Sequence, residues 1–269
     1  MGLLDGKVAF ITGAARAQGR SHAVRLAAEG ADIIAIDICA EAAPVRYRTA
    51  TLDDLDETAQ LVEKEGRGIV ARVADVRDQS SLDAAVAEGV AAFGHIDVVV
   101  ANAGISTWGS VWEMSEETWQ AMIDINLSGV WRTFKAALPT MIAGGRGGSL
   151  IAIASVAGIK SLPAQAHYSA AKHGVVGLTK TAAIELGQYG IRVNSIHPWG
   201  VQSPMVEDPT VGEILGAHPD YAKSFGSILP SPQIADPSDI SDAVVYLASD
   251  MSRCVTGIQL PVDMGATTV

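Results

Sequence analysis

Short apolar runs alternate along the chain with longer stretches in which apolar residues return every three or four positions. The runs predict strands near 7–12, 32–38, 68–74, 96–101, 149–154, 191–196 and 258–262. The longer stretches predict helices near 18–29, 53–65, 79–93, 115–143, 165–188 and 237–249. Alternation of this kind favours an α/β fold, a doubly wound parallel sheet of about seven strands with helices on both faces. The 269 residues suit one domain over 1–269.

The first predicted strand leads into a glycine-rich turn. Residues 7–12 are apolar, Gly13 to Gly19 follows, a helical run begins, and a second apolar strand ends at Asp37. A dinucleotide site requires this order, because the glycines let the backbone approach a pyrophosphate and a helix N-terminus offers it free N–H groups. The acid then accepts hydrogen bonds from the adenosine ribose hydroxyls. The pattern therefore predicts a dinucleotide cofactor.

Tyr168 and Lys172 lie on one face of a predicted helix, because they are separated by one helical turn. An ammonium beside a phenol lowers the pKa of the phenol, and such a tyrosine can take a proton from an alcohol. Ser155 ends the apolar strand 150–154, where the carboxyl end of a parallel sheet faces a ligand crevice. By themselves these residues also fit plainer interpretations, a solvated helix face for the pair and a turn or helix cap for the serine.

Taken together, the motifs resemble those of the short-chain dehydrogenases/reductases, whose fold is of the Rossmann type. They are Thr12-Gly13…Gly19, Asp75-Val76, Asn102-Ala-Gly104, Asn126, Ser155, Tyr168…Lys172, Pro198-Trp-Gly200 and Val262-Asp263. Further details resemble the mycofactocin-associated, carveol dehydrogenase-like members, namely Arg20-Ser-His-Ala23, Asp37-Ile-Cys39 and an extra stretch after the second strand. The resemblance implies an NAD-dependent oxidoreductase that interconverts a small secondary alcohol, such as a terpenoid or alicyclic one, and its ketone.

The same resemblance implies the catalytic roles. Tyr168 would be the acid/base and Ser155 would orient the carbonyl or alcohol. Lys172 would hold the nicotinamide ribose and lower the pKa of the tyrosine, and Asn126 would steady a proton-relay water. From its residues alone, Asn126 is better explained as a polar kink in a buried helix.

The resemblance also implies cofactor contacts at the strand ends. Asp75 would bond the adenine, Val76 would pack on it, and the backbone of Val201 would hold the carboxamide. The complete expected set is Gly13, Arg16, Gln18, Gly19, Asp37, Ile38, Asp75, Val76, Asn102, Ala103, Gly104, Tyr168, Lys172, Pro198 and Val201. Ala17 stands where the family has its middle glycine, so its methyl group would push on the phosphates or require a wider turn.

Arg16 and Asp37 point to different cofactors. A basic residue in the glycine turn often accompanies a 2′-phosphate, whereas a carboxylate facing that phosphate would repel it. Since Asp37 acts at the ribose itself, we expect NAD rather than NADP. Arg16 is then expected to meet the pyrophosphate or the residues after the second strand.

Two long segments interrupt the alternation. The insertion near 40–52 is either a tolerated surface loop or a flap over the adenosine half of the cofactor, and in the mycofactocin-associated proteins such an insertion is taken to trap NAD. The segment near 202–233 carries five prolines and no strong periodicity, and the resemblance makes it a substrate loop. Its apolar residues would line a pocket or belong to a short helix pair packed against the core; they are Met205, Val206, Ile214, Tyr221 and Phe225.

Composition and charge argue against several kinds of partner and location. The chain is 48% hydrophobic, yet none of its apolar runs reaches the ~18 residues of a membrane span. Its first residues lack the regions of a signal peptide, and the two cysteines fit free thiols in a reducing cytosol, so a cytoplasmic protein is expected. The net charge of −11 argues against nucleic acid or an anionic membrane. No metal site is expected, because the histidines are scattered; His197 is expected to be buried and paired rather than catalytic, and His167 is not expected to be catalytic.

Two other functions stay open. A ketoreductase for carrier-bound 3-oxoacyl groups would need a basic patch, and the substrate loop has one lysine against four acids. A non-catalytic dinucleotide sensor would not need Ser155, Tyr168 and Lys172 together. The resemblance further implies a homotetramer built on the helices 115–143 and 165–188, and mycofactocin as an electron acceptor if NAD is trapped.

Overall fold

A single parallel sheet forms the centre of the molecule in the computed structural model, which describes residues 2–42 and 44–269. Its seven strands lie in the order β3-β2-β1-β4-β5-β6-β7, and all pairs are parallel. They are β1 (Val8–Thr12), β2 (Asp32–Asp37), β3 (Ile69–Val73), β4 (Val98–Ala101), β5 (Gly148–Ile153), β6 (Ile191–Pro198) and β7 (Gln259–Val262). The predicted doubly wound sheet of seven strands is confirmed.

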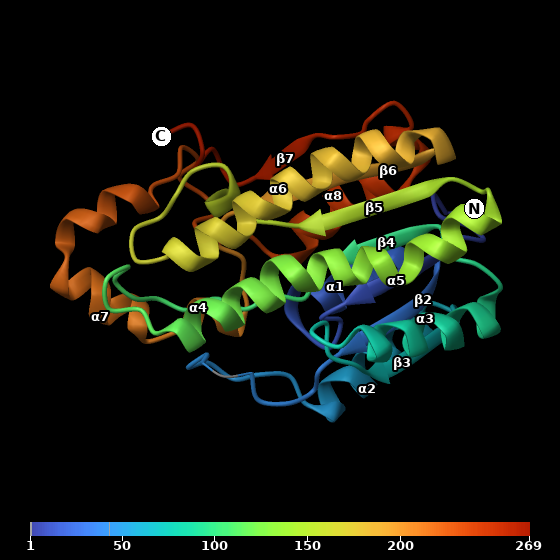
Figure 1. Ribbon diagram of the computed structural model, residues 1–269, viewed down its shortest axis with the longest axis horizontal. Coiled ribbons are helices and arrows are strands. Elements are labelled where there is room, and N and C mark those ends of the chain that lie inside the picture. Colours follow the sequence, from blue (N-terminus) through green and yellow to red (C-terminus); the bar gives the residue numbers. More distant parts are fainter. Residues whose placement is uncertain (1, 43) are drawn as a thin grey trace.

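Helices cover both faces of this sheet (Figure 1). They are α1 (Ala17–Ala28), α2 (Leu52–Lys64), α3 (Gln79–Phe93), α4 (Glu116–Ile123), α5 (Gly129–Gly144), α6 (Ala166–Leu186), α7 (Thr210–Ala217) and α8 (Pro237–Ala248). Helices α3, α5 and α6 pack on one face, whereas α1, α2 and α8 pack on the other. Across the described ranges, no helix is long and apolar enough to cross a bilayer.

The two cores follow from the period of two along each strand. In β1, Val8 and Phe10 face the core under α3, α5 and α6, while Ala9 and Ile11 face the core under α1, α2 and α8. Because both faces are covered, every position of β1 is buried. This explains why these strands are continuous apolar runs rather than alternating ones.

The helix expected over 115–143 differs from the prediction in its middle. Between α4 and α5, residues Asp124–Ser128 form a π-helical turn that contains Asn126. A π-turn adds one residue to the helical period, so a hydrophobic pattern read at 3.6 residues per turn does not reveal it. Such turns frequently mark functional sites.

The two irregular segments lie at one end of the sheet. The described residues of the insertion have no regular structure before α2 begins at Leu52; residue 43 lies outside the described part. The substrate loop, expected to be irregular, contains α7 and two 3-10 segments, Pro204–Glu207 and Pro219–Phe225. In Figure 1 the insertion and α7 lie at the left, the end toward which the β5 arrow points, so both adjoin the carboxyl ends of the strands.

Candidate active site

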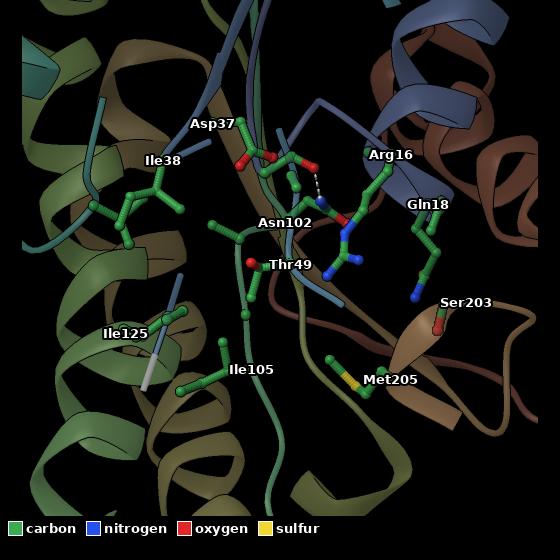
Figure 2. Close-up of a pocket in the computed structure, with 18 of the residues that line it drawn as sticks. Arg16, Gln18, Asp37, Ile38, Thr49, Asn102, Ile105, Ile125, Ser203 and Met205 are labelled. Atoms are coloured by element: carbon green, nitrogen blue, oxygen red, sulfur yellow. Dashed lines mark hydrogen bonds between the residues drawn. The ribbon is translucent and has the colours of Figure 1, made fainter. Parts of the chain in front are cut away.

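A cleft opens at the carboxyl ends of β1 to β4, between the insertion and the substrate loop (Figure 2). Thr49 enters it from the insertion, and Ser203 and Met205 enter it from the substrate loop. Predicted cofactor residues form much of its lining, namely Gly13, Arg16, Gln18, Gly19, Asp37, Ile38, Asp75, Val76, Asn102, Ala103 and Gly104. The structure therefore gathers these residues from four strand ends into one cleft.

The glycine turn is held in a narrow shape. A side chain on Gly19 would place its Cβ 1.9 Å from the carbonyl oxygen of Gly13, so only glycine fits there. Ala17 takes a left-handed φ of 45°, the conformation that a glycine would adopt more easily, and begins α1. The chain thus keeps the turn despite the methyl group, at a cost of about 1–2 kcal/mol in backbone strain.

The start of α1 is suited to an anion. No side chain caps its first turn, and no acidic residue lies in that turn. Free N–H groups and the positive end of the helix dipole therefore face the cleft. Beside them, the buried Oε1 of Gln18 finds no hydrogen-bond partner among the described residues.

Asp37 joins β2 to the glycine turn. Its Oδ2 accepts a hydrogen bond from the N–H of Ala15 at 3.1 Å, and its Oδ1 accepts one from the N–H of Cys39 at 3.2 Å. The guanidinium of Arg16 donates to the carbonyl of Arg48 in the insertion, and burial lowers the pKa of Arg16. Of the two positions expected for Arg16, the structure shows the one at the insertion.

Two further strand ends close the cleft. Asn102 donates its side-chain amide to the carbonyls of Thr12 at 3.0 Å and Gly13 at 3.1 Å, which locks the end of β4 to the glycine turn. Asp75 lines the cleft, but its carboxylate is engaged by Arg77, with Nη2 at 2.6 Å from Oδ2. The carboxylate expected to bond adenine therefore already has a partner.

The four predicted catalytic residues converge beyond Gly104 at the inner side of the cleft. A Cβ built on Gly104 would lie 2.8 Å from Oδ1 of Asn126 and 3.7 Å from Nζ of Lys172. The Nζ of Lys172 lies 5.5 Å from the ring centroid of Tyr168, and the Ser155 side chain is near enough to the phenol to lower the pKa of Tyr168. Elements far apart in sequence thus meet: the π-turn, the end of β5 and the first turns of α6.

Ser155 is fixed through its backbone as well as its side chain. The hydroxyl accepts a hydrogen bond from the N–H of Ala157 at 3.1 Å. The carbonyl of Ser155 accepts from the N–H of Gly158 at 2.9 Å and from Nδ1 of His197 at 2.6 Å. His197 is fully buried, and burial lowers its pKa to about 4, so it is a neutral imidazole at physiological pH. The expectation of a buried, paired His197 agrees with this geometry.

Burial shifts the pKa values of both Tyr168 and Lys172. Burial raises the pKa of Tyr168 to about 12, and the nearby Ser155 side chain opposes this only in part. Burial also lowers the pKa of Lys172 to about 8. Its ammonium donates to the carbonyl of Ile153 at 2.9 Å instead of contacting the phenol oxygen. Because the ammonium is turned toward this backbone carbonyl, the lowering of the tyrosine pKa by Lys172 stays a prediction.

Asn126 has a defined bonding pattern. Its Oδ1 accepts from the N–H of Ile105 at 3.1 Å, and its Nδ2 donates to the carbonyl of Met122 at 3.0 Å. The expected residues Pro198 and Val201 follow at the end of β6, where Val201 pairs with Ala235. These two do not line the cleft described above.

Several residues near the site were not predicted. Tyr47 from the insertion lines the cleft, and Ser106, Thr107 and Gln165 are buried and hydrogen-bonded beside the predicted catalytic residues. Trp108 and Trp199 flank Phe225 of the substrate loop, with ring centroids 5.6 Å and 6.0 Å away. The sequence holds one indication of these residues, namely aromatic side chains in segments whose other residues are mostly polar or small.

Comparisons with known proteins agree with this geometry. Residues 13–267 match a family described as enoyl-(acyl carrier protein) reductase. The chain is 52% identical to a Mycobacterium tuberculosis protein named as an uncharacterized NAD-dependent oxidoreductase, over 98% of this chain and 97% of that protein. It is 44% identical to (-)-trans-carveol dehydrogenase of Rhodococcus erythropolis, over 99% of both chains. The crystal structure of carveol dehydrogenase from Mycobacterium avium in complex with NAD is 48% identical, covers 100% of both chains and superposes with a TM-score of 0.95.

Proposed function

The chain belongs to the short-chain dehydrogenase/reductase family, and from that premise we propose that it is an NAD-dependent oxidoreductase that interconverts a small secondary alcohol and its ketone. The observation that carries the proposal is the convergence of Ser155, Tyr168, Lys172 and Asn126 beside Gly104, at the inner side of the cleft. A protein that only sensed a dinucleotide would have no use for this group.

NAD fits the residues of the cleft. The uncapped start of α1 suits the pyrophosphate, and the anchored carboxylate of Asp37 suits ribose hydroxyls rather than a 2′-phosphate. When bound, NAD supplies the group that accepts or returns a hydride. Relatives named as NAD-dependent or solved with NAD support the same cofactor.

Tyr168 moves the proton at the substrate oxygen, and Ser155 orients that oxygen. With a pKa of about 12, Tyr168 rests as a neutral phenol, the form that donates a proton to a carbonyl. Alcohol oxidation requires the phenolate. Lys172, on the same helix and 5.5 Å from the ring centroid, is the cation placed to stabilise the phenolate once its ammonium leaves the carbonyl of Ile153.

The substrate is a small, mostly apolar alcohol, of the terpenoid or alicyclic kind. Trp108, Trp199 and Phe225 form an aromatic cluster between the substrate loop and the ends of β4 and β6, a surface that suits an apolar ring. The name of the Rhodococcus relative, a carveol dehydrogenase, supports this class.

The insertion holds NAD in the cleft, and mycofactocin is the acceptor that reoxidises it there. The support is that the insertion is tied down on both sides. Arg16 binds the carbonyl of Arg48, and Arg46 reaches Glu213 of α7 with Nη1 at 3.1 Å from Oε2. Release of a bound dinucleotide would require these contacts to open.

The protein assembles as a homotetramer through α4, α5 and α6. Large apolar side chains on these helices are exposed in the single chain: Trp119 is 40% exposed, Trp131 46% and Ile184 83%. An interface over these helices would cover them. The mass in solution, measured by light scattering, tests this assembly.

Replacement of Tyr168 by Phe tests the proposed chemistry. We expect Tyr168→Phe to keep the fold and its NAD, and to lose turnover of secondary alcohols by about 10²–10⁴-fold. NAD is identified and counted by mass spectrometry after dialysis and denaturation, and turnover is followed with both added NAD and an artificial electron acceptor. Tyr189→Phe, at an exposed tyrosine far along the chain, is the matched control. A Tyr168→Phe enzyme of normal rate would exclude the proposed mechanism, and an empty wild-type protein would exclude trapping.

A further inference from the structure

Three consecutive residues after β4, Ile105–Thr107, connect the catalytic residues to one another. All three are buried, and each forms a hydrogen bond to a different part of the site. The bonds join Ile105 N to Asn126 Oδ1 at 3.1 Å, Gln165 Nε2 to Ser106 Oγ at 2.8 Å, and Thr107 Oγ1 with His167 Nε2 at 2.7 Å. This connecting segment therefore contacts the π-turn on one side and the two residues that frame the start of α6 on the other.

The position of Gln165 and His167 matters because Tyr168 comes next. Gln165 is the N-terminal boundary residue of α6, and its carbonyl accepts from the N–H of Ser169 at 2.8 Å. A shift of the connecting segment would thus displace the first turn of α6, which carries Tyr168. The segment would also displace Asn126, because the N–H of Ile105 holds its side chain.

One residue of the insertion reaches this segment. Tyr47 lines the cofactor cleft, and its hydroxyl oxygen accepts a hydrogen bond from the N–H of Ser106 at 3.1 Å. Burial raises the pKa of Tyr47 to about 12, so its hydroxyl stays protonated and neutral near pH 7. The polar end of the tyrosine therefore points inward to a buried backbone group rather than to solvent.

We propose that Tyr47 is a positioning residue of the active site, supplied by the insertion. Through Ser106 it holds the connecting segment, and through that segment it sets the positions of Asn126 and of the α6 turn that bears Tyr168. The insertion then has two separable tasks, covering the cofactor and aligning the catalytic residues. This inference rests on the proposed function for its catalytic meaning, but the hydrogen-bonded connection can be tested without it.

The insertion stays in place over the cofactor cleft without the Tyr47 hydroxyl. The insertion has its own anchors: Arg16 to the carbonyl of Arg48, Arg46 to Glu213 at 3.1 Å, and Arg48 to Asp54 at 2.7 Å. Removal of one hydroxyl leaves these contacts and the aromatic ring in place. Loss of alignment can therefore be separated from loss of the cofactor.

The test is the Tyr47→Phe variant of the full chain, purified without adding or removing NAD. We expect the NAD content and the KM for the alcohol to stay near the wild-type values, while kcat falls by about tenfold to a hundredfold because the catalytic groups are misplaced. Ser106→Ala, which breaks the bond to Gln165, should lower kcat in the same way. The double variant should lose less than the product of the two single effects, because both act through one segment. Tyr189→Phe is again the control.

Amide hydrogen exchange gives a readout that needs no turnover. In Tyr47→Phe, the amides of 105–107 and of the first turn of α6 should exchange faster, while those of β1 and α8 should not change. Unchanged exchange at 105–107, an unchanged kcat, or activity lost only in proportion to lost NAD would each overturn the inference. If the wild-type protein carries NAD but oxidises no alcohol, the proposed function fails, and the exchange experiment still decides whether Tyr47 holds the segment.

Discussion

At the scale of single residues, the neutrality of His197 determines how Ser155 is held. An imidazole whose Nδ1 donates to the Ser155 carbonyl at 2.6 Å must accept at Nε2, and the Ser195 hydroxyl lies 2.9 Å from that atom. The Ser155 carbonyl therefore fixes the tautomer of His197, the Ser195 hydroxyl can donate to Nε2, and His197 in turn holds the backbone that aims the Ser155 hydroxyl.

His197→Leu should lower both activity and stability. Loss of the donor frees the Ser155 carbonyl on one side, so we expect a destabilisation of about 1–3 kcal/mol and a lower kcat with little change in NAD content. Ser195→Ala removes only the partner of Nε2 and should have a smaller effect in the same direction. Denaturant unfolding and steady-state kinetics measure both quantities. If Ser195→Ala lowered stability and kcat as much as His197→Leu, the bond from His197 to the Ser155 carbonyl would not be the main contribution.

That Ser155, Tyr168 and Lys172 belong to one candidate site could be predicted from sequence, but their electrostatic state could not. Tyr168 and Lys172 follow from helical spacing and from a motif, which are local properties. Their pKa values, about 12 and about 8, depend on burial by distant segments. Tyr47 was missed for the same reason, because its contact with Ser106 joins residues 59 positions apart.

At the scale of elements, the strands were predictable from continuous apolar runs. The helices that cover the sheet were predictable because apolar residues return every three or four positions over a long stretch. The π-turn was not, and a short helix pair in the substrate loop was only an alternative to an irregular segment. Asp124–Ser128 interrupts a helix without a proline or glycine signal, and α7 has only eight residues in a segment rich in prolines. Short elements of this kind are set by tertiary contacts rather than by propensity.

Phe225 packs the substrate loop against two tryptophans. Phe225 lies between Trp108 and Trp199, and each pair of rings is worth about 0.5–1.5 kcal/mol beyond burial of area. Phe225→Ala should therefore loosen the loop, raise the KM for cyclic alcohols more than that for short linear ones, and leave the NAD content unchanged. Limited proteolysis within 202–233 should become faster. The matched substitution Tyr221→Ala, on the same loop but outside this cluster, should leave the preference for cyclic alcohols intact; an identical effect of both variants would speak against the aromatic contact.

At the scale of the whole molecule, buried histidines lie on both faces of the sheet and beside the site, so acid conditions lower the stability of the whole fold. Three histidines are buried in different layers: His22 between α1 and α8, His167 at the start of α6, and His197 on β6. Burial lowers their pKa values to about 3, about 4 and about 4, respectively. Each is therefore neutral in the folded protein well below the pH at which it would take up a proton in the unfolded chain, near 6.5.

The sign of the resulting pH dependence is fixed by these lowered values. The unfolded chain binds more protons between about pH 6.5 and 4, so stability is fully present above that window and is lost as the pH falls through it. Each histidine contributes a slope of about 1.4 kcal/mol per pH unit within the window. Urea unfolding from pH 7.5 to 5 measures the slope before most carboxylates titrate. His22→Gln, whose amide can still reach the hydroxyl of Ser241, should reduce that slope by one histidine's share; an unchanged slope would mean that His22 is charged in the folded protein.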